Sequence, residues 1–182
     1  MKKQTILGVT MTVLFYALVV TACQFPIIQS SMPTSQSGQM IELPFETIEL
    51  RQPAKPDYWM DEKPGLLIIA SSQEITQASQ YITDDAIATL QKMDFLQSFA
   101  LIAFNGLKPT LHYDFKIQKI IKNKDQIYVF VQPSQAGLQE VISSLYHLIS
   151  IKKEGEWMKT FTFHLYIDNK ESDISPVSMY IP

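Results

Sequence analysis

The sequence predicts a mainly β (α+β) fold, an antiparallel sheet or β-sandwich-like domain of about seven strands with one or two short helices inserted. Apolar residues alternate with polar residues over several stretches, which is typical of strands with one buried and one solvated face. Turn residues separate these stretches. Helical periodicity occurs in one region only, which disfavours a doubly wound α/β fold.

The first half of the domain is predicted to hold two strands and the helices. Alternation over 45–51 predicts a first strand, and the apolar run 66–70 predicts a buried one. Ser71 and Glu74 have the spacing of a capping box, which indicates the start of a short amphipathic helix. Thr83 is expected to cap a second helix.

The second half of the domain is predicted to consist of strands. The run 99–104 is apolar on both faces and should be a central strand. Asn105 and Gly106 form a turn signal directly after it. Further strands are predicted over 145–151, 157–167 and 177–181.

A hairpin is expected between these segments. Phe115, Ile117 and Ile121 are expected to share one face of its first strand. Residues 123–125 provide the turn, and 127–131 form the returning strand.

The first 23 residues have the layout of a secretory signal peptide. Lys2 and Lys3 precede an apolar run over 6–20, and small residues lead to Cys23, the chain's single cysteine. The segment resembles a bacterial lipobox, in which the cysteine is lipidated and becomes the first residue of the mature chain. The alternative is a retained transmembrane helix, but the run is shorter than the about 20 residues that a span prefers.

The organisation that follows is a signal peptide over 1–22, a lipidated Cys23 with a flexible linker to residue 44, a β-rich domain over 45–153 and a strand extension over 154–182 packing on it. Loss of Lys2 and Lys3 with the leader lowers the formal charge from −3 by two, to −5. This balance gives no basic patch for nucleic acid. Because a lipidated Cys23 attaches the chain to a bilayer, we expect the protein on the outer side of the cell membrane, or at the outer membrane or cell surface if there are two membranes. The bilayer is then one of its partners.

No catalytic, cofactor-binding or metal site is predicted. His112, His147 and His164 lack a short ligand spacing, and His164 alternates onto a solvent face. Ser144 lies three residues before His147, which places the two side chains on opposite faces of a strand. Glycine is scarce, which argues against a phosphate-binding loop.

Two stretches carry a family resemblance. In the first, 99–117, an apolar strand is followed by Gly106, Lys108, Pro109, Thr110 and Tyr113; the second is 144–149, Ser-Leu-Tyr-His-Leu-Ile. Together they resemble the PrcB-like family, and the resemblance covers roughly 45–153. The chain departs from the family at Leu111 and His112, where the family has paired glycines, and at Leu145, where it has proline.

The resemblance implies a binding or assembly role, such as stabilising a surface or periplasmic protease complex, and no catalytic residues. It carries over a candidate partner-binding surface, namely Lys108, Pro109, Thr110, Tyr113, Tyr146 and His147. Each of these has a structural alternative: Pro109 and Thr110 would shape a strand connection, and Tyr146 and His147 would be packing residues held by hydrogen bonds.

Two other functions stay open. A Lys108–Thr110 loop could block the active site of a protease, which would make the protein an inhibitor. A glycan or small ligand could instead bind aromatic and acidic side chains that lie together in the sequence, namely Tyr58, Trp59, Asp57, Asp61 and Glu62.

Overall fold

The computed structural model describes residues 40–53 and 62–182, and within them it does not describe the side chains of 51–53, 108–114 and 134–143. The described residues form a mostly β domain with two helices and mainly antiparallel sheets, which confirms the predicted fold class. Cys23, most of the predicted linker, Tyr58 and Trp59 lie outside the described residues.

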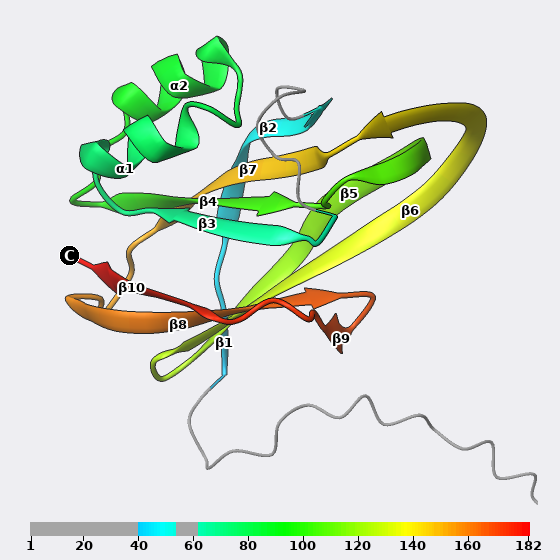
Figure 1. The fold of residues 1–182 in the computed structure, drawn as a ribbon. Helices are drawn as coiled ribbons and strands as arrows, with labels where there is room; N and C mark the ends of the chain where they lie inside the picture. Colours follow the sequence, from blue (N-terminus) through cyan, green and yellow to red (C-terminus); the bar gives the residue numbers. More distant parts are fainter. Residues whose placement is uncertain (1–39, 54–61) are drawn as a thin grey trace, which may run out of the picture. The chain divides into compact units, whose positions relative to one another are not determined.

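The described strands form two sheets that pack face to face (Figure 1). Sheet A has the order β1-β5-β6-β8-β10, with β9 beside β8, and sheet B has the order β2-β7-β4-β3. The strands of sheet A are β1 Ile41–Glu42, β5 Lys108–Asn123, β6 Gln126–Ser143, β8 Lys159–Ile167, β9 Lys170–Glu171 and β10 Val177–Ile181. Those of sheet B are β2 Phe45–Pro53, β3 Gly65–Ile69, β4 Ser98–Phe104 and β7 Leu145–Lys152.

Both helices lie in the connection from β3 to β4. Helix α1, Ser72–Ala78, begins with the capping box that the sequence predicts, because Ser71 and Glu74 exchange hydrogen bonds there. Helix α2, Asp84–Gln91, is capped by the Thr83 hydroxyl, which accepts from the backbone of Ala86. The helices cover the face of sheet B that points away from sheet A (Figure 1).

Two hydrophobic cores follow from this three-layer arrangement. The larger lies between the sheets and includes Phe99 of β4, Ile149 of β7 and Phe163 of β8, none of them exposed. The smaller lies between sheet B and the helices and includes Leu90 and Ile102. Strands β3, β4 and β7 of sheet B are therefore buried on both faces, whereas sheet A has one face in solvent.

A bulge in β5 corrects the predicted face of the hairpin. The hairpin forms, but its register shifts between Ile117 and Lys119. The extra residue moves the alternation by one position, so Ile120 is buried in the larger core and Ile121 is not.

Three further features go beyond the predicted pattern. Strands β6 and β8 pair in parallel, with β7 of the other sheet between them in the chain. Leu43, within the predicted linker, is buried in the larger core, so the fold begins before residue 45. Gly106 turns the chain from sheet B to sheet A at φ 78°, and a Cβ there would lie 2.6 Å from the backbone oxygen of Lys63.

Candidate functional site

The predicted partner-binding residues Lys108, Pro109, Thr110 and Tyr113 lie in a two-stranded extension of sheet A. Strand β8 pairs with β6 only over 126–131, and β1 pairs with β5 only at Ile121 and Lys122. Beyond these pairs β5 and β6 pair only with each other, as far as the described strands show (Figure 1). We call residues 108–114 and 132–143 the β5–β6 arm.

The arm corrects the prediction that Lys108–Thr110 is a loop. Lys108, Pro109 and Thr110 are strand residues paired with 141–143 of β6. Pro109 has no backbone N–H, and an edge strand accommodates it because a second ladder is not required there. The register then shifts: Leu111 pairs with Glu140 but Tyr113 with Gln135, so four residues of β6 lie opposite one of β5.

Tyr146 and His147 are separated from the arm, because they lie on β7 in sheet B. Both side chains have no exposed surface. A side chain with no exposed surface adds nothing to a surface that a partner contacts in this conformation. Both residues fit the structural alternative given above: they are packing residues held by hydrogen bonds.

Tyr146 belongs to a polar cluster beneath helix α2. Its hydroxyl donates to the Glu49 carboxylate of β2 and accepts from the backbone N–H of Thr83 at 3.3 Å. The Thr83 hydroxyl donates to the same carboxylate at 2.9 Å. Burial, with the Glu49 carboxylate as the next cause, raises the pKa of Tyr146 well above its usual range. Glu49 thus holds the start of α2 to β2 and β7.

His147 connects the two sheets from the opposite face of β7. Its Nδ1 accepts from the backbone N–H of Ile117 at 2.9 Å, and its Nε2 lies 3.0 Å from Thr47 Oγ1. Because Nδ1 accepts, the neutral ring carries its hydrogen on Nε2 and donates it to Thr47. Burial, with a smaller contribution from Lys116, lowers the pKa of His147 to about 4.

The sequence did not identify the partners of His147, because both depend on bulges. The register of β2 shifts between Thr47 and Glu49, and that of β5 shifts directly after Ile117. Ile117 lies on β5, the strand of sheet A that faces β7. Its backbone N–H donates to His147 and not to a neighbouring strand. Ser144 Oγ is buried and has no hydrogen-bond partner in the described structure.

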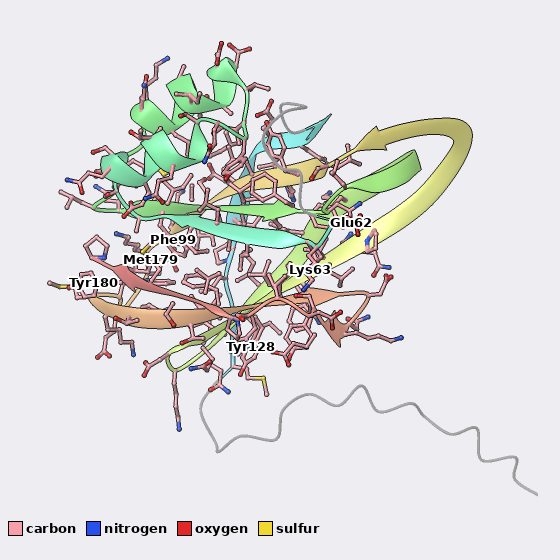
Figure 2. The ribbon with its side chains drawn as sticks, in the orientation of Figure 1. Glu62, Lys63, Phe99, Tyr128, Met179 and Tyr180 are labelled. Carbon is pink, nitrogen blue, oxygen red and sulfur yellow. The ribbon has the colours of Figure 1, made fainter. Side chains whose placement is uncertain are left out.

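The solvent face of sheet A carries an aromatic group that the sequence only partly predicted. Tyr128 of β6 stacks on His164 of β8 with ring centroids 5.1 Å apart, and Phe130 packs against Tyr166 at 5.0 Å. Glu171 of β9 accepts from Tyr166 and lies 3.0 Å from His164 Nδ1. The placement of His164 on a solvent face is as predicted, and Figure 2 shows Tyr128 on the side of sheet A away from the helices.

Burial is the main cause of the pKa shifts on this face. It raises the pKa of Tyr166 to about 12, with the Glu171 carboxylate as the second cause, and it also raises the pKa of Tyr128. These tyrosines are neutral at physiological pH; Tyr166 donates a hydrogen bond to Glu171, and Tyr128 stacks on His164. Among the side chains that the structure describes, no group of His, Cys, Asp and Glu could hold a metal ion.

Comparison with known proteins adds no family. The chain matches no family model, no curated protein and no solved structure. The PrcB-like resemblance therefore stays a prediction from the motifs alone. No helix in the described part of the chain is both long and apolar enough to span a bilayer.

Proposed function

We propose that this protein is a membrane-anchored, extracytoplasmic lipoprotein whose β-rich domain binds another protein. Acyl chains on Cys23 hold it at the bilayer, and the β5–β6 arm meets the partner. Two or more acyl chains give stable attachment, whereas a single chain is marginal. The role that the PrcB-like resemblance implies makes a protease complex the first partner to test.

The observation that carries this proposal is the arm. A two-stranded ribbon gains less from packing than a sheet of three or more strands, and its outer edges leave backbone groups unpaired. An open strand edge can accept a strand from another protein, since backbone hydrogen bonds supply the affinity. Among the described strands, Lys108–Thr110 pair with β6 alone, so they form such an edge.

Site-specific photo-cross-linking in cells tests the proposal. A benzophenone amino acid at Lys108 should give a discrete cross-linked protein, whereas the same group at Lys92, an exposed lysine after α2, should not. Equal cross-linking from both positions, or none from Lys108, would reject the arm as the binding site. If the captured protein is a protease, its half-life should fall when this protein is absent.

Protease inhibition is the second candidate, because Lys108–Thr110 is extended, as a substrate segment in a protease cleft is. An inhibitor should lower the activity of the captured protease, and replacing Lys108 to Thr110 with alanines should restore it. A stabilising subunit should instead leave the rate per folded protease molecule unchanged and prolong its lifetime. The glycan alternative rests on Tyr58 and Trp59, and ligand binding that survives Trp59→Ala would count against it.

A further inference from the structure

Five large hydrophobic side chains are exposed in the described residues: Met40, Ile41, Leu96, Met158 and Tyr180. Leu96 is 83% exposed and Met158 is 80% exposed. Single exposed apolar residues need no explanation, so the question is whether these five lie together.

The strand registers bring four of these residues to one end of the two sheets. Ile41 pairs with Lys122, next to the β5–β6 turn. Met158 directly precedes β8, and Tyr180 pairs with Thr160 near the end of β10. Lys159 forms a 2.6 Å ion pair with Asp125 in the same turn, which joins Met158 to that turn.

Hydrogen bonds bring Leu96 to the same end. The backbone N–H of Lys153 donates to Gln97, and its ammonium group donates both to the Phe95 carbonyl and to Pro182 at the end of β10. A cation–π contact joins the neighbours of Ile41 and Met158 at this end, since the Lys122 ammonium lies 3.9 Å from the centre of the Trp157 ring. We call this end, with its five exposed hydrophobic side chains, the apolar end; Figure 2 labels Tyr180 there.

The apolar end is also where the chain from the predicted anchor joins the domain. Sixteen residues, 24–39, separate Cys23 from Met40. A flexible chain of this length spans roughly 20–25 Å on average. An anchor at Cys23 therefore keeps Met40 close to the bilayer. This proximity raises the effective concentration of the apolar end at the bilayer, so weak apolar contacts are enough for it to bind.

We infer that the apolar end docks on the lipid bilayer, with Leu96, Met158 and Tyr180 entering the headgroup boundary. This inference rests on the proposed lipid anchor and adds a fixed orientation of the domain to it. The charges at this end are mixed: Lys159 pairs with Asp125, and Lys152 lies 3.5 Å from Glu46. Docking is therefore driven by apolar contact and depends little on anionic lipid. In this orientation the arm, at the other end of β5 and β6, points away from the membrane.

The test uses the lipidated protein in vesicles of phosphatidylethanolamine and phosphatidylglycerol. With Cys23 acylated, Met158→Cys supplies the single free thiol for an environment-sensitive fluorophore. Lys170→Cys, at the far end of β8, is the matched control. Nitroxide-bearing lipids should quench the label at 158 at least threefold more than the label at 170. Adding Ile41→Asp and Leu96→Asp should abolish this difference while the protein still floats with the vesicles.

The outcomes separate the anchor from the docking. Equal quenching at 158 and 170, in protein that floats with the vesicles, overturns the docking and leaves the anchor standing. Protein that does not float overturns the anchor, and the docking with it. A dimer in solution that Leu96→Asp dissociates overturns the inference in favour of a second copy as the occupant of the apolar end.

Discussion

Strands β4 and β8 show how differently the two sheets use their faces. In β4, Leu101 faces sheet A and Ile102 faces the helices, and neither is exposed. In β8, Phe163 is buried between the sheets, whereas its neighbour Thr162 lies on the solvent face. A strand covered on both faces is typically a near-continuous apolar run, and a strand covered on one face typically alternates. The helices between β3 and β4 create this difference.

Alanine substitutions at neighbouring positions test the comparison and give the largest effects. Leu101→Ala and Ile102→Ala should each lower the free energy of unfolding by about 2–5 kcal/mol, because each leaves a cavity in a different core. In β8, Phe163→Ala should lower it by about 3–5 kcal/mol, and Thr162→Ala by less than about 1 kcal/mol. Urea denaturation measures all four. A tolerated Ile102→Ala would mean that the helices do not seal sheet B.

The sequence predicted most of the fold, because each strand type has its own pattern. The run 99–104 and the alternation over 157–167 identify the central strand of sheet B and the one-sided strand of sheet A. Ile121 was misplaced because a bulge leaves no mark in hydrophobic periodicity. The arm was missed because its sequence lacks sustained alternation, and Lys108–Pro109 suggested a loop.

The site was less predictable than the fold. Tyr146 and His147 were singled out by motif, but their partners Glu49, Thr83 and Ile117 are distant in sequence. Polar residues in a buried strand do indicate hydrogen-bonded networks, since unpaired polar groups are costly to bury. The pattern cannot say which partners meet them, because bulges and inter-sheet packing decide that.

Acid should weaken the domain through His147, the next largest effect. Its pKa is about 4 in the folded protein and about 6.5 when unfolded, so the unfolded state takes up the proton first. Stability is therefore retained above about pH 6.5 and falls as the pH drops towards 4, by at most about 3 kcal/mol. Unfolding measured against pH should show this slope, and His147→Gln should flatten it. A slope that survives His147→Gln would show that other groups cause it.

Two tyrosine hydroxyls that each donate to a carboxylate extend the comparison to polar contacts. Tyr146 binds Glu49 under the helices, and Tyr166 binds Glu171 on the solvent face. Tyr146→Phe should lower the free energy of unfolding by about 1–3 kcal/mol, because the backbone N–H of Thr83 then also loses its acceptor in a buried site. Tyr166→Phe should lower it by less than about 1 kcal/mol, since water can replace the hydroxyl beside Glu171. Equal losses would show that the solvent face of sheet A is as well sealed as the helix-covered face of sheet B.

The smallest expected effect concerns a cation on the solvent face. The Lys119 ammonium lies 4.6 Å from the centre of the Phe130 ring, and such contacts contribute about 0.5–1 kcal/mol at exposed sites. Lys119→Met keeps the aliphatic stem over the ring and removes the charge. The loss in the free energy of unfolding should be within that range, and high salt should reduce the part of it that comes from long-range charge. Lys152→Met, which removes an exposed ion pair with Glu46, is the matched control and should change stability by less than about 1 kcal/mol. A loss above about 2 kcal/mol for Lys119→Met would mean that other groups besides this lysine shield Phe130 and Tyr166 from water. Sheet A would then be covered on both faces, as strands β3, β4 and β7 of sheet B are.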